Sequence, residues 1–551
     1  MISRRSWWLT SLSIALVHIT VTMSYAQKPA HQGVLAHNIT IQDAAESVLA
    51  QHPLLHFQKA QVSLDEGLRL QMSGLFDTQF ATSISQQWMT SPLSVYEAES
   101  VASGTFGGTV ERSSQGAMTE NVARLFRTGV SVAATLQVQR MLDNISSVGG
   151  SNVSTVSLAL NIPLLRNRGR KVVAAQESAA IGEVRAAAND LNQEASTLLE
   201  TMAVDYWNLL ASQKNLDIAA ASEARARKYL EDVNTLVEAD QIPKNDLHEL
   251  EANLAQRSAT RIIAEQSVVA AQEQVALDMG LDRSTINRFE PRASDEFPSA
   301  ISEPALEAVA KEIDDFMALA LSRRGDYLSA QQRLAEQREL SYAARNRLQP
   351  QLDLSLNAGY SGLQAGRKFL NVVDAVGTAA PGPNAGASLT FSFPPRNEIA
   401  RGQLAQADAL ARQMELQSEQ IQHEILTEVV TALNGLVHAF QAVEQTTRAV
   451  AAAQASLDGQ REKYRVGMGS VVDLVTIEDR LNTALSAQVQ SQVSFALALS
   501  LMRYATATFV EPSSQSLSLS LYAHVFETIP DPHSFGVRAE NKCGSHFCEH
   551  Q

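Results

Sequence analysis

The residue types that most often bind metal gather at the end of this chain of 551 residues. Cys543, His546, Cys548 and His550 carry side chains that zinc prefers, but their spacing does not match a complete zinc site. In an oxidising compartment, a local disulfide or two unused thiols is the favoured interpretation. A metal site at these four residues is the open alternative.

No other part of the sequence has the residue types and spacing of a catalytic centre. We find no convincing nucleophile–base group, phosphate-binding loop or metalloprotease motif. We therefore expect no enzymatic activity and no cofactor. The formal net charge of −15 argues against nucleic acid as the main partner.

The N-terminus has the pattern of a secretory signal. Two arginines precede an apolar stretch, Trp7 to Met23, and the small residues Ser24 and Ala26 follow it. This order predicts a signal peptide over residues 1–26 that is removed after export. A retained membrane anchor is the alternative.

Two parts of the chain, residues 38–280 and 313–509, repeat one plan. In each, a helix leads to an alternating strand, and a second strand ends in a proline, Pro163 or Pro394. The predicted strands are about 76–90 and 153–163 in the first repeat, and about 350–361 and 386–394 in the second. Residues 281–312 are interpreted as a linker, and residues 510–551 as a poorly ordered tail.

After each proline comes a long stretch with almost no Pro and few Gly, at residues 167–234 and 397–464. Each predicts a helix of roughly 100 Å. Apolar residues recur every seven positions, which indicates a coiled-coil seam that needs neighbouring helices. In the second repeat they are Val429, Leu436, Val443, Val450, Leu457 and Tyr464. Return helices are expected at 246–279 and 471–507.

The turn between the two helices of the second repeat carries local signals. Gly467 favours the end of a helix. Ser470 and Asp473 have the spacing of a capping arrangement at the start of the next helix. Tyr464 is readable as the last residue of the seam.

The sequence resembles the TolC-like outer-membrane efflux protein family over about residues 38–509. The resemblance rests on four segments in this order within the duplicated frame: Ile162–Gly169, Asp205–Leu209, Arg347–Gln351, and Tyr464–Gly467 together with Asp473-Leu474. It implies a mainly α fold with membrane β-strands, in which each repeat gives strands and a long coiled-coil helical hairpin.

The resemblance further implies four strands per subunit and a homotrimer that closes a twelve-stranded β-barrel, with a helical tube in the periplasm. Because residues 91–152 are too long for a hairpin turn, we expect an enlarged extracellular loop there. The alternation from Val130 to Val138 within it leaves open whether that segment crosses the membrane.

Functional residues are implied at the periplasmic turns. By resemblance, Asp473 forms a carboxylate ring at the pore entrance, and Thr476 stands where the family has a second ring. Asp246 and Tyr464 match a pair that latches the helical hairpins shut. Gly469 replaces an arginine that reinforces this latch in the family, so a weaker latch is expected.

The resemblance also implies the partners: a periplasmic adaptor protein, an inner-membrane transporter and outer-membrane lipid. The turns expected to contact the adaptor contain Asp240 and Gln241 in the first repeat, and Val466, Gly467 and Met468 in the second. The implied function is the outer-membrane channel of a tripartite efflux or type I secretion system. A periplasmic coiled-coil tether without a pore is the alternative.

Overall fold

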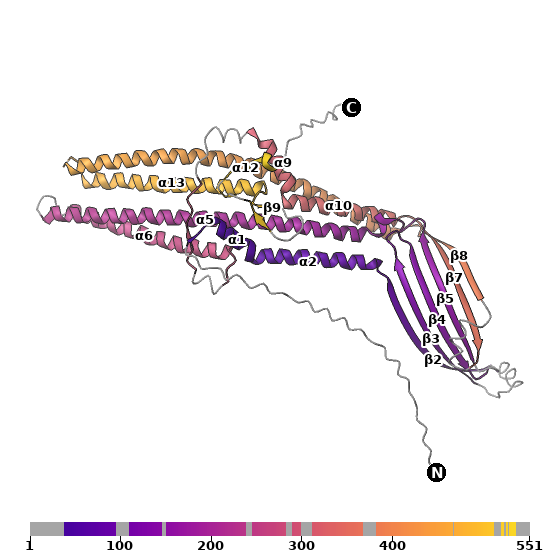
Figure 1. Cartoon of the computed structure of the whole chain (residues 1–551). Helices are drawn as coiled ribbons and strands as arrows, with labels where there is room; N and C mark the ends of the chain where they lie inside the picture. Colours follow the sequence, from indigo (N-terminus) through magenta and orange to yellow (C-terminus); the bar gives the residue numbers. More distant parts are fainter. Residues whose placement is uncertain are drawn as a thin grey trace, which may run out of the picture.

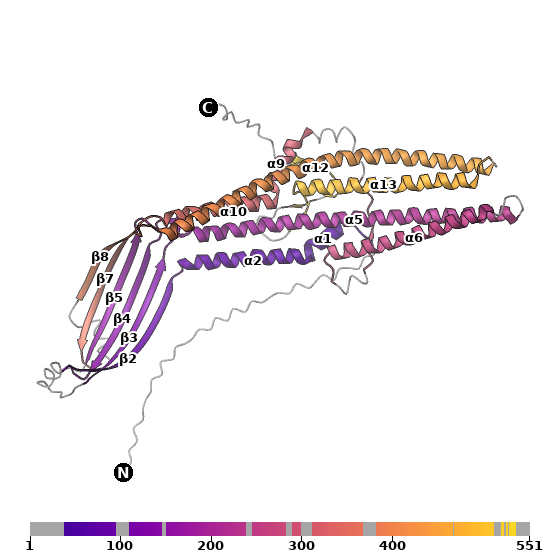
Figure 2. The ribbon, with the colours of Figure 1, turned by 180° about the vertical axis from the view of Figure 1, so that it is seen from behind.

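The chain is a long molecule with a bundle of helices at one end and a sheet of strands at the other, as two opposite views of the computed structural model show (Figures 1 and 2). The structure describes residues 38–94, 110–145, 150–238, 245–282, 289–298, 311–366, 382–466, 468–511, 519–522, 525–526 and 528–535.

Apart from the short α4, each helix of one repeat has a counterpart in the other. The first repeat contains α1 (Ile41–Gln51), α2 (Pro53–Ser73), the short α4 (Arg170–Val173), α5 (Ala175–Glu238) and α6 (Asn245–Asp278). The second contains α9 (Ile313–Arg323), α10 (Gly325–Asn346), α12 (Glu398–Arg465) and α13 (Val471–Ala505). Two 3-10 turns, η1 (Gly74–Phe76) and η2 (Pro532–Phe535), complete the described helical structure.

Two helical hairpins form the half of the molecule away from the sheet (Figure 1). In one, α6 packs along α5; in the other, α13 packs along α12. The hairpins touch each other where α13 lies against α5. Nearer the sheet, α2 and α10 take the places of the return helices, because α2 packs on α5 and α10 packs on both α5 and α12.

The sheet has six strands in the described chain, not the four that we expected. They are β2 (Gln79–Pro92), β3 (Val110–Leu125), β4 (Ser131–Asp143), β5 (Gly150–Pro163), β7 (Gln351–Ala365) and β8 (Gly382–Ser392), in that spatial order and all antiparallel. The expected extracellular loop over 91–152 is therefore wrong for most of its length. Its middle is the hairpin β3–β4, and all of Val130 to Val138 except the first residue belongs to β4.

The two faces of this sheet differ in polarity. Strand register places Ile84, Met118 and Val138 side by side on one face, and this face continues through Leu158 to Phe391. The other face carries mostly Ser, Thr, Gln and Asn. Because neighbouring residues in a strand point to opposite faces, the sheet separates an apolar from a polar surface.

The same backbone corner joins strand to helix in both repeats. Shortly after Pro163 and Pro394, the chain passes through Asn167 (φ 63°) and Asn397 (φ 45°), both in the left-handed region. Asparagine enters this region more readily than other residues with a side chain. Each corner redirects the chain from the sheet into a long helix.

The middle of the molecule holds a core around Tyr206 and Trp207 of α5, both almost fully buried. The Tyr206 hydroxyl donates to the backbone oxygen of Ile39 (3.0 Å) and to Asp295 Oδ2 (2.7 Å). Here β1 (Asn38–Ile39) pairs in parallel with β6 (Arg292–Ala293). The segment interpreted as a linker therefore contributes a strand and a carboxylate to this core.

The start of the expected disordered tail is also folded. Strand β9 (Val510–Glu511) pairs with β10 (Ser520–Leu521), and Phe526 is buried in the central core. Arg503 holds this segment by donating to the backbone oxygen of Thr528 at 3.1 and 2.8 Å. The expectation of a poorly ordered tail is therefore wrong for the described residues 510–511, 519–522, 525–526 and 528–535. The four Cys and His residues near the C-terminus lie outside the described residues.

Of the helices that the structure describes, none combines the length and the apolar character needed to span a membrane.

Candidate functional site

The tip of the α12–α13 hairpin is fixed by a side-chain cap. Ser470 Oγ accepts the backbone N–H of Asp473 (3.1 Å), and Asp473 Oδ2 accepts the Ser470 hydroxyl (2.7 Å) and backbone N–H (3.3 Å). This reciprocal capping box satisfies amide groups that a helix start leaves free. The sequence prediction of a cap at this position is confirmed.

The cap leaves the Asp473 carboxylate at the surface. The side chain is exposed, and Thr476 lies three residues later on the same side of α13, also exposed. Hydrogen bonds from Ser470 lower the pKa of Asp473, with a smaller contribution from Lys463. The group therefore stays ionised at neutral pH, as a carboxylate ring at a pore would require.

Tyr464 ends the seam between α12 and α13. It packs in a cluster with Leu457, Leu474 and Leu481. Burial, and secondarily the charge of Asp232 on α5, raise the pKa of its hydroxyl. The proposed partner in the latch, Asp246, is the second residue of α6, but its side chain lies outside the described residues.

Two arginines of the α5–α6 hairpin connect it directly to the other hairpin. Arg225 of α5 donates to Glu478 Oε1 (2.7 Å) and Asn482 Oδ1 (2.9 Å) of α13. Arg257 of α6 pairs with Asp479 of α13. Since Glu478 is only 4% exposed, its charge depends on Arg225 for compensation.

The hairpins also share apolar contacts close to their tips. Val471 and Val475 of α13 pack against a cluster of α5 and α6 residues that includes Val233 and Leu250. We call the two arginine pairs and this cluster the inter-hairpin lock. It holds the ends of the two hairpins together at several points along their length.

Sequence reasoning did not find the arginine pairs of the lock. Arg225 and Glu478 are 253 positions apart, so no local spacing links them. Both belong to long helices where charged residues are usual and most of them face solvent. The duplicated frame matches α13 with α6 as return helices, but it does not place α13 beside α5.

The turns expected to contact an adaptor are partly described. Val466 and Met468 are exposed, Met468 to 81%. An apolar side chain that protrudes this far from a helical tip is available to a partner. Asp240, Gln241 and Gly467 lie outside the described residues.

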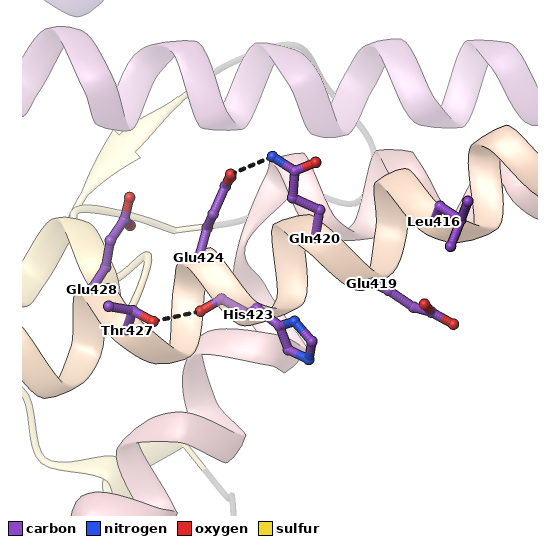
Figure 3. Close-up of a pocket in the computed structure, with 7 residues that line it drawn as sticks. All are labelled: Leu416, Glu419, Gln420, His423, Glu424, Thr427 and Glu428. Atoms are coloured by element: carbon purple, nitrogen blue, oxygen red, sulfur yellow. Dashed lines mark hydrogen bonds between the residues drawn. The ribbon is translucent and has the colours of Figure 1, made fainter.

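A surface hollow of about 550 Å³ lies along α12, far from both tips. Figure 3 shows Gln420, Glu424 and Glu428 on one side of this helix, and Glu419 and His423 on the other. Glu428 is engaged by Arg324 at 2.7 Å. Since these side chains come from one helix and do not converge on a point, the hollow is not a catalytic centre.

In the part of the chain that the structure describes, no group of three or more His, Cys, Asp or Glu could hold a metal ion.

Comparison with known proteins agrees with this architecture. Residues 317–506 match the sequence profile of the family described as outer membrane efflux protein. Over these residues the chain is similar to the outer membrane efflux protein family. No curated protein sequence matches it.

Solved structures of similar fold cover most of this chain. The outer-membrane channel OprN has 18% identity and a TM-score of 0.59, with 85% of this chain and 89% of that chain covered. The Campylobacter jejuni outer membrane channel CmeC has 14% identity and a TM-score of 0.57, with 85% of each chain covered. The Vibrio cholerae outer membrane protein VceC has 16% identity and a TM-score of 0.58, with 85% and 96% covered. These likenesses show the shared fold.

Proposed function

We propose that three copies of this chain form the outer-membrane channel of a tripartite export system, which receives substrate from an inner-membrane pump through a periplasmic adaptor. The observation that carries the proposal is the two-faced sheet, which runs directly into two long helical hairpins. Its apolar face exposes large side chains such as Phe80, Ile84 and Trp88 at 67%, 77% and 76%. Lipid would cover this face, while the polar face would line water.

A single chain cannot complete such a wall. Strands β2 and β8 are the two edges of the sheet, and open edges in lipid leave backbone groups unpaired. Pairing β2 of one subunit with β8 of the next, under rotational symmetry about the pore, removes every edge. The helical hairpins would then hang side by side into the periplasm as a tube. A tether without a pore would need the hairpins but not the two-faced sheet.

The inter-hairpin lock would keep the periplasmic end of this tube closed at rest. The lock joins α13 to both helices of the other hairpin, so loss of either arginine pair weakens the contact between the hairpins. Below it, Asp473 and Thr476 would stand around the axis and favour cations. The exposed tip at Val466 and Met468 would receive the adaptor.

The first test is planar-bilayer conductance of the detergent-extracted protein, with its mass measured in the same detergent. A trimer that inserts and gives discrete conductance steps would support the channel. A protein that stays water-soluble, or a trimer that never conducts, would contradict it.

The lock has a matched pair of variants one helical turn apart. Arg257→Ala removes a tie from α6 to the other hairpin, whereas Arg261→Ala removes a tie from α6 to Glu223 within its own hairpin. We expect Arg257→Ala to raise the resting conductance several-fold and Arg261→Ala to leave it near that of the wild type. Equal conductance of all three proteins would contradict the lock.

A further inference from the structure

The β3–β4 hairpin is inserted between two strands that a four-stranded subunit would pair directly. On one side, β3 pairs with β2 from Gln79↔Ala123 to Pro92↔Val110. On the other, β4 pairs with β5 from Ser131↔Asn161 to Leu142↔Gly150. The hairpin therefore spans the whole height of the sheet and keeps β2 and β5 apart along their length.

The register gives β4 the same two faces as the rest of the sheet, whereas β3 is more polar. Leu136 and Val138 of β4 lie beside Val156 and Ser154 of β5 on the apolar side. On β3, Met118 lies beside Ile84 on this side, and Glu120 is a charged residue in the middle of it. A one-residue slip would move every one of these side chains to the other face, so the match is specific.

The opposite face of β4 is polar, as it is in the flanking strands. Thr135 and Gln137 point to this side, next to Ser157 and Thr155 of β5. The Thr155 hydroxyl is within hydrogen-bond distance of the Ser361 hydroxyl of β7 (3.2 Å). The polar surface thus continues without a break from the inserted hairpin across β5 and onto β7.

The turn that closes the hairpin is built into the junction between sheet and helices. Arg127 forms an ion pair with Glu177 of α5 and lies over the ring of Phe76 at 4.7 Å. The backbone N–H of Gly169 donates to the oxygen of Thr128 (2.9 Å). Contacts of this kind belong to a fixed part of the wall, because a surface loop would not need them.

We propose that the β3–β4 hairpin is part of the transmembrane wall, so that three subunits close a barrel of eighteen strands. This inference rests on the proposed function and extends it. Barrel diameter grows roughly in proportion to strand number, so the lumen would be about half as wide again as that of a twelve-stranded barrel. Membrane barrels of roughly 16–18 strands enclose an open aqueous channel, which suits bulky polar cargo at the outer end.

The decisive experiment is site-directed fluorescence on trimers in lipid nanodiscs. A Cys543→Ser, Cys548→Ser background provides a protein without native cysteines, into which one cysteine at a time is introduced. An environment-sensitive dye is attached at Leu136 or Val138, and in matched variants at Thr135 or Gln137. Quenching is then compared between a nitroxide in the lipid phase and iodide in water.

We expect lipid-phase quenching at positions 136 and 138, and iodide quenching at 135 and 137. Iodide quenching at all four positions would overturn the proposal, because the hairpin would then be an aqueous loop or plug. As a second measurement, the largest polyethylene glycol that enters from the outer side should have a radius about half as large again as for a twelve-stranded relative. An equal cut-off would also overturn it. If either expected result is not obtained with a trimer that conducts, only the eighteen-stranded barrel is contradicted. A trimer that does not conduct contradicts the proposed channel function.

Discussion

The two repeats agree in their helices and differ in their strands. In the second repeat, β7 and β8 pair directly, and each continues into a helix, α10 or α12. In the first repeat, β2 and β5 also adjoin helices, but β3 and β4 between them adjoin none. The helical tube therefore has the same composition in both halves, while the wall above the first half is wider.

The difference shows which part of this fold tolerates insertion. A long helix is held by neighbours along its whole length, so an extra helix would disturb the seam on both sides. An antiparallel hairpin adds two strands whose backbone groups pair with each other and with the old edges. The added strands leave the corners at Asn167 and Asn397 in place.

The largest loss of stability should come from a substitution at Gly129, a residue of the β3–β4 turn that only the first repeat contains. It has φ +95°, and a Cβ there would overlap the backbone oxygen of Asn167 and contact Pro163. We expect Gly129→Val to destabilise the trimer by about 2–5 kcal/mol through backbone strain and overpacking. Thermal loss of the trimer in detergent measures this.

Gly435 of α12 provides the control in the second repeat. Nothing lies within 4 Å of the Cβ that would be added there. Gly435→Ala should leave the trimer unchanged or stabilise it by up to about 1 kcal/mol, because alanine favours the helix. Equal tolerance of both substitutions would mean that the hairpin turn is not held by the junction.

The ends of the two return helices differ in charge. At the end of α13, burial lowers the pKa of Arg503 to about 10. At the end of α6, burial and then the neighbouring Asp205 raise the pKa of Asp278 to about 8. The folded state thus holds a proton on Asp278 that the unfolded chain, with a pKa near 3.8, releases.

The stabilising effect of this proton is complete below about pH 4 and disappears as the pH rises through about 8. Asp278→Asn should therefore be more stable than the wild type above pH 8, by about 1–3 kcal/mol, and nearly equal to it at pH 4. Melting temperatures across this range test the sign. The control is Glu273→Gln, an exposed position on the same helix, which should shift nothing.

The smallest change in stability is expected at the capped tip of the second repeat. Ser470→Ala removes the cap of α13 but keeps the Asp473 charge, and should cost about 1 kcal/mol. Amide hydrogen exchange at the first turn of α13 should quicken accordingly. Ser494→Ala, at an exposed mid-helix serine, should not change it.

Asp473→Asn separates the cap from the pore, because the amide oxygen of asparagine can accept the same hydrogen bonds from Ser470 but carries no charge. If the carboxylate forms a ring, this variant should lower cation preference in single-channel recordings by several-fold, while Ser470→Ala should not. Unchanged selectivity in Asp473→Asn would remove this residue from the pore.

The sequence was most informative where the pattern is long or local. Seven-residue periodicity predicted the α12 seam, and the Ser470 cap needed only four consecutive residues. The inserted hairpin was harder to recognise, because β3 is polar on both faces, with Glu120 on the side where its neighbours are apolar. Alternation was visible only near Val130 to Val138, in the other strand of the pair.

Long-range pairing is the part that one sequence cannot supply. Strand β6 has only two residues, so no periodicity marks it, and its role depends on β1 at the far end of the repeat. The inter-hairpin lock also depends on residues that are distant in the sequence, since Arg257 and Asp479 lie 222 positions apart. Such contacts arise from the topology of the whole chain.

The pairing of β1 with β6 also constrains the order in which the chain can fold. Ile39 reaches its partners only after residues 292–295 are available, and Tyr206 bonds to both segments at once. Contacts between such distant residues form late, because a long loop must close first. Strand β1 therefore stays unpaired until the chain has been translocated as far as the segment between the repeats. The central core of this protein can therefore be completed only after more than half of the chain has been translocated.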